Sequence, residues 1–328
     1  MTVRERVQKT LNFEKCDRLP VVEWARWWNQ TWDRWRRDGI PDLTWEQSQD
    51  YFGLDKMPHI QATCHSPDVR PKYHGGPLIS GDVKYDDIQP LLMSDARINE
   101  VVENARRLKA EHDRGDIAIR LHIDGFFSLP RRFFGIEAHL LAFYDQPDLM
   151  HRMNRDLVAF NTRLLCAVFE VLVPDLVDFA EDMSYNHGPM LSREMFNEFC
   201  LPYYKQIVPV AKSKGSALMI DSDGDITKMI PWFYEAGIKG VLPLERQAGV
   251  DIVKIRQLYP DFIMLGGFDK MTMPFGEEAM RPEFERILPV MRSGGFLPSV
   301  DHQTPPGVSL ENYKIYVRLL KEYACKAV

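Results

Sequence analysis

The sequence predicts an α/β fold, a (β/α)₈ TIM-type barrel that forms a single domain over residues 1–328. Short aliphatic runs bounded by turn residues alternate along the chain with longer helical patterns. Such runs are typical of parallel strands buried on both faces, and their alternation with helices predicts right-handed βαβ units. About seven or eight units in one domain favour a closed barrel, because barrels often reach this length.

The elements follow in chain order from the hydrophobic pattern. A short helix is predicted first, at Val3–Leu11. Strands are predicted at 19–24, 117–127, 176–183, 216–220, 238–244, 262–267 and 295–300. Helices are predicted between them, at 147–173, 192–214, 226–236, 250–258 and 282–293. The pattern does not single out an eighth strand.

Residues 24–92 depart from this alternation and are predicted as an irregular insertion after the first strand. Long loops at the carboxyl ends of barrel strands usually cover or shape the site. The insertion is rich in tryptophan, and aromatic clusters are usually core, so packing within the loop is one interpretation. A stacking surface for a flat or methylated ligand is the other. The residues concerned are Trp24, Trp27, Trp28, Trp32, Trp35 and Trp45.

Composition excludes several classes of function. The formal net charge of −6 argues against a basic field for nucleic acid, and the five scattered cysteines form no CxxC pair. The N-terminus lacks an apolar core of signal-peptide length, and no run reaches the roughly 20 apolar residues of a membrane span. We therefore expect a cytoplasmic protein with reduced thiols and a small-molecule substrate, with no membrane or nucleic-acid partner. A homodimer is compatible with these features.

Acidic residues and histidines end nearly every predicted strand. Gathering like charges is costly, so such a ring persists when a metal ion, a cationic substrate or bound protons offset the repulsion. About half of the set can instead cap the following helices, Asp225 and Asp251 being good cap candidates. The strand-end residues are Glu23, His122, Asp124, Glu181, Asp182, Asp221, Asp223, Asp225, Glu245, Asp269, Asp301 and His302.

A metal site is predicted from four of these residues. Asp221 and Asp223 are two apart, which places both on one side of an extended strand end. Glu245 and His302 complete a site of three or four ligands that suits zinc or a harder ion such as manganese. Acid–base catalysis is predicted for Glu181, Asp182, Asp223 and His302. Substrate contacts are predicted for Glu23, Arg26, Trp27, His122, Asp124 and Asp269.

Several segments resemble the uroporphyrinogen decarboxylase superfamily, which includes corrinoid-dependent methyltransferases. They are RERVQKTLNFEKCDRLPV at the N-terminus, GPMLSREMFNEFCLPYYKQIV, the run from Asp221 through Glu245 to LGGFD at 265–269, and PSVDHQTPPGVSLENY near the end. The resemblance covers nearly the whole chain in order and spacing. It implies a distorted (β/α)₈ barrel with its pocket at the carboxyl ends of the strands.

The first chemistry of this superfamily is cofactor-free decarboxylation of uroporphyrinogen, in which arginines of an RQAGR motif bind substrate carboxylates. The matching region here reads EWARWWNQTWDRWRR, so only Arg26 corresponds to that motif. An acidic mouth is a poor partner for a substrate with many carboxylates. The resemblance leaves a carboxy-lyase on a smaller substrate as an alternative, with Asp223 or His302 as proton donor.

The second chemistry is methyl transfer, in which zinc held by a His-x-Cys pair and a later Cys activates a thiol. Here Asp221 and Asp223 stand at the pair and His302 at the last position, which implies an oxygen-rich site or no metal. We predict a methyltransferase that moves a methyl group between a small substrate and a corrinoid protein or thiol, with zinc or another divalent metal. A methylammonium group would suit an acidic, tryptophan-rich pocket. A non-catalytic partner of a corrinoid protein is the remaining alternative.

Overall fold

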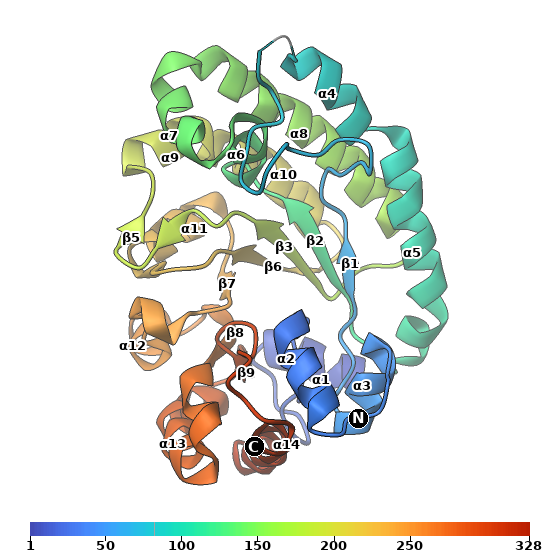
Figure 1. Ribbon diagram of the computed structural model, residues 1–328, viewed down its shortest axis with the longest axis vertical. Helices are drawn as coiled ribbons and strands as arrows, with labels where there is room; N and C mark the ends of the chain where they lie inside the picture. The colour runs from blue at the N-terminus through green and yellow to red at the C-terminus, as the bar shows by residue number, and fades with distance from the viewer. Residues whose placement is uncertain (82) are drawn as a thin grey trace.

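The computed structural model describes residues 1–81 and 83–328. Its centre is a curled, seven-stranded parallel sheet with the order β1-β2-β3-β6-β7-β8-β9 (Figure 1). The α/β class and the parallel sheet are as predicted, but a closed eight-stranded ring is not confirmed. The strands are β1 (His59–Gln61), β2 (Arg120–Asp124), β3 (Leu176–Ala180), β6 (Ala217–Asp221), β7 (Gly240–Leu242), β8 (Ile263–Phe268) and β9 (Phe296–Val300), and a small hairpin pairs β4 (Ser184–Tyr185) with β5 (Gly188–Pro189).

The segment 19–24 lies where an eighth strand would close the sheet, but it forms no strand, so that prediction was wrong. Its polar backbone groups are used elsewhere. The amide of Val21 donates to the Asp55 carboxylate at 2.8 Å, and the carbonyl of Val21 accepts from the Asp55 amide at 2.8 Å. Within residues 1–81 and 83–328, no backbone hydrogen bond joins this segment to β9. A side chain does so instead, because Trp24 Nε1 donates to the carbonyl of Val300 at 2.8 Å.

The region predicted as an irregular insertion contains regular structure, including the first strand of the sheet. It holds α2 (Asn29–Arg37), α3 (Trp45–Phe52), β1 and α4 (Tyr85–Leu92). Helix α3 begins at a capping box in which Thr44 and Gln47 satisfy each other's backbone amides. The pattern missed β1 because a strand of three residues is too short to show a hydrophobic period.

Helices cover the outer face of the curled sheet (Figure 1). Asp251 is the N-cap of α12, as predicted, and accepts the amide of Val253. Asp225 lies one residue before Ile226, the N-cap of η1, and accepts the amide of Thr227. The predicted helix 192–214 is two helices that meet at Cys200. The remaining helices are α1 (Val3–Leu11), α5 (Asp95–Arg114), α6 (Ser128–Phe134), α7 (Ile136–Asp145), α8 (Pro147–Phe169), α9 (Arg193–Phe199), α10 (Leu201–Lys212), η1 (Thr227–Met229), α11 (Ile230–Ala236), η2 (Arg246–Ala248), α12 (Ile252–Leu258), η3 (Lys270–Phe275), α13 (Glu277–Arg292) and α14 (Leu310–Lys326).

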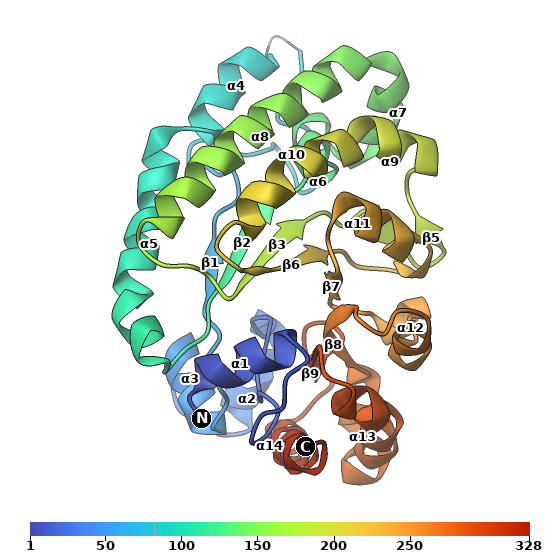
Figure 2. The ribbon, with the colours of Figure 1, turned by 180° about the vertical axis from the view of Figure 1, so that it is seen from behind.

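The apolar core has two parts, one outside the sheet and one inside it. The outer part packs the helices onto the sheet. The inner part takes apolar residues from the strands and seals the amino end of the sheet with Val7 and Leu11 of α1. Helix α1 crosses this end in Figure 2. The inner apolar side chains from the strands and their flanks are Val22, Met57, Ala118, Leu176, Met219, Leu242, Leu265 and Leu297.

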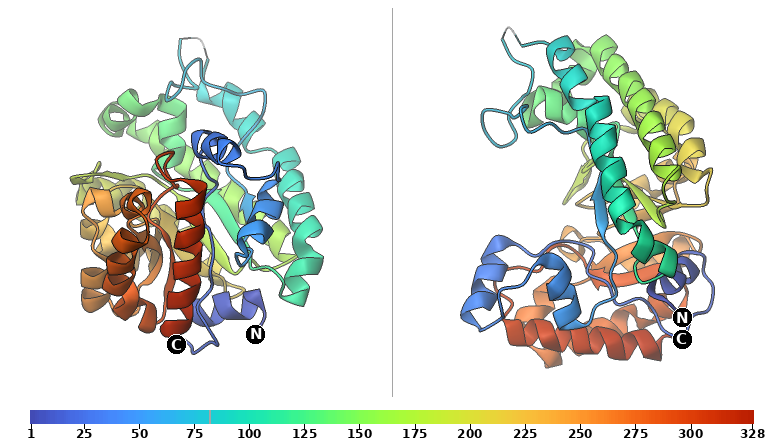
Figure 3. Two further views of the ribbon diagram at one scale, coloured as in Figure 1. Left: turned by 60° about the horizontal axis from the view of Figure 1, so that its bottom comes forward. Right: turned by 90° about the vertical axis from the view of Figure 1, so that its right-hand side faces the viewer.

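The inner apolar plug fills the space inside the sheet toward its amino end, and the main cavity lies at the carboxyl end. Both termini lie together at the opposite end, beside α1 and the end of α14 (Figure 3). Among the helices that the structure describes, none combines the length and the apolar composition needed to cross a bilayer.

Candidate active site at the carboxyl end of the sheet

A cavity of about 680 Å³ opens at the carboxyl end of the strands. Its walls come from the segment after residue 19, from β1, β2 and β6, and from the loop after β9. Most of its lining groups are charged or aromatic, so the cavity offers many polar contacts to a ligand. They include Glu23, Trp24, Arg26, Trp45, His59, Gln61, Arg107, Arg120, His122, Asp182, Asp221, Asp223, His302 and Gln303.

Three predicted ligands, Asp223, Glu245 and His302, converge at one side of this cavity. One ligand atom from each lies within 4.8 Å of the others, and His302 Nε2 is 3.6 Å from Asp223 Oδ2. Glu245 accepts the amide of Gly224 at 2.9 Å, and the preceding Leu244 has a left-handed φ of 69°. A leucine in that region is strained, and such strain is concentrated at functional sites. Asp223 raises the pKa of His302.

The donor set of this group fits a divalent metal ion. One imidazole nitrogen and two carboxylates suit zinc, or a harder ion such as manganese. Within the described parts of the chain, neither Asp223 nor Glu245 forms a salt bridge with a lysine or arginine that would compete with a cation. His302 packs edge-on against Trp24, with ring centroids 6.2 Å apart, which orients the imidazole.

A second polar cluster lies deeper, across β2, β3 and β6, and an arginine holds it together. Arg120 donates to both oxygens of Asp178 at 2.7 and 2.9 Å and to Asp221 at 2.7 Å. His122 Nδ1 lies 2.5 Å from Asp178. The guanidinium already supplies the positive charge that a metal would bring. Asp221, predicted as a metal ligand, is therefore bound to Arg120 and is not part of the Asp223 group.

Burial and ion pairing act against each other in this cluster. Burial alone would raise the pKa of Asp178, but Arg120 and His122 lower it below its ordinary value. Burial raises the pKa of Asp221, with Asp178 adding to the shift and Arg120 opposing it. For His122 burial lowers the pKa, but the carboxylates of Asp178 and Asp221 outweigh it and raise the pKa overall.

Two carboxyls predicted for the site are buried and hydrogen-bonded. Glu181 caps α6 by accepting the amides of Phe126, Phe127 and Ser128 at 2.7–2.9 Å, and Tyr204 donates to it as well. Its oxygens are thereby occupied by the chain itself. Burial raises the pKa of Glu181 to about 7.

Glu23 lies at the floor of the main cavity and is 3% exposed. Tyr313 donates to one oxygen at 2.8 Å and Ser299 to the other at 3.4 Å. Burial raises the pKa of Glu23 to about 7, against these hydrogen bonds. These contacts tie the segment 19–24 to β9 and α14.

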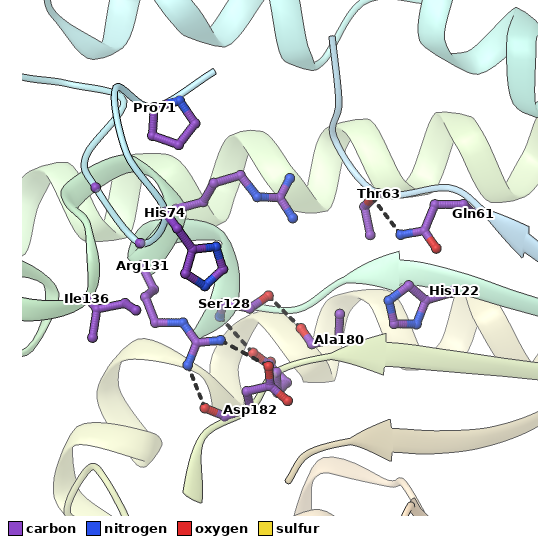
Figure 4. Close-up of a pocket in the computed structure, with 14 residues that line it drawn as sticks. Gln61, Thr63, Pro71, His74, His122, Ser128, Arg131, Ile136, Ala180 and Asp182 are labelled. Atoms are coloured by element: carbon purple, nitrogen blue, oxygen red, sulfur yellow. Dashed lines mark hydrogen bonds and ion pairs between the residues drawn. The ribbon is translucent and has the colours of Figure 1, made fainter. Parts of the chain in front are cut away.

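A neighbouring cavity of about 500 Å³ lies beside α6 (Figure 4). Gln61, His122 and Asp182 line both cavities. Asp182 has a left-handed φ of 44°, and Arg131 donates to its carbonyl at 2.8 Å and its carboxylate at 3.3 Å. Burial, together with the charge of Asp223, raises the pKa of Asp182. The two cavities thus meet at predicted site residues.

The other predicted substrate contacts are placed differently. Asp124 is buried and binds Arg132 at 2.7 Å and the Cys64 amide at 2.5 Å. Asp269 caps η3 by accepting the amide of Met271, outside the residues that line either cavity. Trp27 is buried, packed against Trp32, Trp35, Trp45, Phe52 and Tyr313.

The tryptophans that do line the main cavity already contact arginines of the chain. The guanidinium of Arg120 lies 5.5 Å from the Trp24 ring centroid, and that of Arg26 lies 5.8 Å from the Trp45 ring. Of the predicted tryptophan cluster, Trp27 and Trp35 are buried in the core, Trp32 packs against it and Trp28 is exposed. The two rings at the cavity have internal cation–π partners.

Sequence reasoning missed Arg120, Asp178 and His59 at the site. The signal was present in the two strands themselves. RLHID alternates charged or polar with apolar residues, and LVDFA carries an acid in the middle of an aliphatic run. A charge at an inward position of a buried strand requires a partner, so Arg120 and Asp178 could have been paired.

Three comparisons bear on this site. The family model described as uroporphyrinogen decarboxylase (URO-D) matches residues 64–323. A curated uroporphyrinogen decarboxylase from Nautilia profundicola is 26% identical over 193 residues, which are 55% of this chain and 50% of the relative, so the match spans about half of each. A methyltransferase structure from Methanosarcina mazei superposes with a TM-score of 0.64 and 15% identity, over 98% of this chain and 99% of that one. At that identity the likeness concerns the fold.

Proposed function

Because the chain belongs to the uroporphyrinogen decarboxylase family, we propose that it is a methyltransferase, which moves a methyl group between a small substrate and a corrinoid protein or a thiol. The group formed by Asp223, Glu245 and His302 carries this proposal. It lies where the zinc of thiol-methylating members would be expected from the resemblance, and its donor atoms fit a divalent metal.

Each group of the chain has a definite task in this proposal. Asp223, Glu245 and His302 would hold the metal, which when bound supplies a Lewis acid that polarises the heteroatom bearing the methyl group. Asp182 lies between the two cavities and can orient a polar part of the substrate. The aromatic wall of Trp24 and Trp45 keeps water from that side.

Two features disfavour the other candidate substrates. Acidic side chains outnumber arginines in the lining of the main cavity, which disfavours a porphyrinogen with many carboxylates. The acidic side chains are Glu23, Glu46, Asp182, Asp221 and Asp223, and the arginines are Arg26, Arg107 and Arg120. A quaternary ammonium group would have to compete with Arg120 for Trp24, and with Arg26 for Trp45. The cavity therefore favours a small, uncharged methyl donor.

The metal site is tested by elemental analysis and zinc titration calorimetry of the metal-stripped protein. We expect one zinc per chain, with affinity reduced at least 100-fold in His302→Ala and in Asp223→Asn. Asp225→Asn is the matched control, because Asp225 accepts the amide of Thr227 and the side-chain oxygen of asparagine can accept it as well. Unchanged affinity in His302→Ala would remove the proposed site.

Methyl transfer is tested with cob(I)alamin as acceptor, by the appearance of the methylcobalamin spectrum. The donors are 2-methoxyphenol and tetramethylammonium, and 2-mercaptoethanol with methylcobalamin tests the reverse direction. We expect metal-dependent transfer in at least one of these reactions. A metal-free protein that instead releases carbon dioxide from uroporphyrinogen would overturn the proposal.

A further inference from the structure

His122 and Asp178 form a hydrogen-bonded pair whose members come from adjacent strands. The two residues face each other in the register of β2 and β3, and His122 Nδ1 lies 2.5 Å from Asp178 Oδ2. Asp178 is fully buried, and Arg120 donates to both of its oxygens. Asp178 therefore stays ionised and holds the Nδ1 hydrogen of the imidazole toward itself.

The other nitrogen of the ring faces open space. His122 lines the main cavity and the neighbouring one, and its side chain is 13% exposed (Figure 4). Among the residues that the structure describes, none is hydrogen-bonded to Nε2, and Nε2 is not among the fully buried unpaired atoms. A ring fixed at Nδ1 and open at Nε2 has the geometry of a proton donor or acceptor.

Titratable and charged groups from four strands, β1, β2, β3 and β6, surround this ring. His59 of β1 packs edge-on at a centroid distance of 5.0 Å, and Arg120 lies on the same strand as His122. Asp178 of β3 is hydrogen-bonded to it, and Asp221 of β6 is 3.7 Å from Nδ1. The two carboxylates and the guanidinium next to the ring have a net charge of −1 when all are ionised. A protonated His122 imidazole would neutralise this charge.

We propose that His122 is the proton-transfer residue of the site and that Asp178 is its positioning residue; the inference rests on the proposed methyl transfer. The acceptor, a reduced corrinoid or a thiolate, bonds to the methyl carbon as the bond from that carbon to the donor heteroatom breaks. The heteroatom keeps the electron pair and takes the proton from Nε2 of His122. The imidazole is left neutral and regains a proton from water.

This role narrows the substrate to donors whose leaving group is strongly basic. An alkoxide or phenoxide remains a strongly basic leaving group until it is protonated, even where a metal would polarise it, whereas a tertiary amine departs from a quaternary ammonium as a neutral molecule. The proton of His122 thus matters for the first kind and not for the second. The pair of donors distinguishes a proton-transfer residue from one that merely shapes the cavity.

The chain contains a matched control at the opposite end of the sheet. His112 Nε2 lies 3.0 Å from Asp175 Oδ2, and both side chains are buried. His112 lines neither cavity at the carboxyl end. The same substitution, histidine to glutamine, can therefore be made in a pair that faces the cavity and in a pair that does not.

The kinetic test compares His122→Gln and His112→Gln with cob(I)alamin as acceptor. We expect His122→Gln to lower transfer from 2-methoxyphenol about 100- to 1,000-fold, as for loss of a general acid. Transfer from tetramethylammonium should change less than about 5-fold, and His112→Gln should match wild type with both donors per folded molecule. Equal losses with both donors would overturn the proposal. A loss of less than about 10-fold with 2-methoxyphenol would also overturn it, whether or not the wild type accepts tetramethylammonium. A wild type inactive with every donor and in the reverse reaction would instead count against the proposed function.

A second test needs no turnover. In ¹⁵N NMR spectra of the histidine rings, neutral His122 should carry its proton on Nδ1, and the His122→Gln spectrum assigns the signal. Asp178→Asn should lower the pKa of His122, because the ionised partner is gone. A proton on Nε2, or a pKa unchanged in Asp178→Asn, would overturn the pairing whatever the activity.

Discussion

A histidine–aspartate pair lies at each end of the sheet, and the surroundings of the two pairs differ. At the amino end Asp175 accepts from Arg4 at 3.0 Å, Gln8 at 2.7 Å and the Ile119 amide at 2.8 Å, besides His112. These bonds fasten α1 and α5 to the sheet. The remaining nitrogen of His112 is buried, and none of the residues that the structure describes is hydrogen-bonded to it.

At the carboxyl end the pair of His122 and Asp178 has comparable hydrogen bonds, but the second imidazole nitrogen has different surroundings. Its aspartate is also buried and also binds an arginine, Arg120. The free nitrogen of its imidazole reaches two cavities instead of packed side chains. A histidine–aspartate pair can therefore have a structural or a catalytic role. The role depends on whether the second imidazole nitrogen faces a cavity or packed side chains.

The largest effect that sharpens this contrast is expected at Asp178. Asp178→Ala leaves Arg120 and His122 buried with one anionic partner fewer, which should cost about 3–5 kcal/mol in the free energy of unfolding. Urea unfolding followed by circular dichroism measures it. Asp178→Asn, which keeps hydrogen-bond acceptors, is the milder control. A cost below about 1 kcal/mol would mean that Asp221 alone compensates Arg120.

The next effect concerns pH, since carboxyls at the two ends shift in opposite directions. Burial raises the pKa of Glu23 from 4.5 to about 7, while at the amino end the His112 and Ile119 hydrogen bonds outweigh burial and lower the pKa of Asp175. The folded state holds a proton on Glu23 that the unfolded chain releases. Its contribution to stability is full below about pH 4.5 and is lost as pH rises through about 7.

In wild type, the ionisation of Glu23 should lower the free energy of unfolding by about 2–3 kcal/mol between pH 5 and pH 8. Glu23→Gln should not show this decrease. The measurement is the free energy of unfolding of wild type and variant at both pH values. The contribution of Asp175 behaves oppositely: it is present above pH 4 and is lost as the solution becomes more acidic. Parallel pH profiles of wild type and Glu23→Gln would show that Glu23 stays ionised in the fold.

The smallest effect is expected at Arg4, whose side chain is partly exposed. Arg4→Ala removes one of several donors to Asp175, and we expect a loss of about 1 kcal/mol in stability. Methyl transfer per folded molecule should not change, because Arg4 lies at the end away from the cavity. A change in activity larger than the change in folded fraction would show coupling between the two ends.

Much of the fold was predictable because aliphatic runs report burial directly. Six of the seven predicted strands overlap strands of the sheet. The strand predicted at 19–24 does not form, because the amide of Val21 donates to Asp55, which is 34 residues away. No local sequence pattern indicates this contact. Strand β1 was not predicted, because three residues are too few to show a hydrophobic period.

The site was predictable to the extent that strand ends meet at one edge. This rule brings Asp223, Glu245 and His302 together, as the structure does. It could not separate Asp221 from them, because that depends on the reach of Arg120 from two strands away. It also could not distinguish the adjacent Glu181 and Asp182. The carboxylate of Glu181 binds the amides at the start of α6, whereas Asp182 lines both cavities.

The gap at the segment 19–24 has a consequence for the width of the pocket. In an unbroken barrel the bore is set by the number of strands and their stagger, and it changes only when the whole ladder changes. Here the circumference is completed by Trp24 and Glu23, whose side chains reach β9 and α14. The lengths of these two side chains thus set the distance between the segment 19–24 and the elements β9 and α14. Single substitutions at this seam can widen or narrow the pocket for a new substrate while every strand keeps its register.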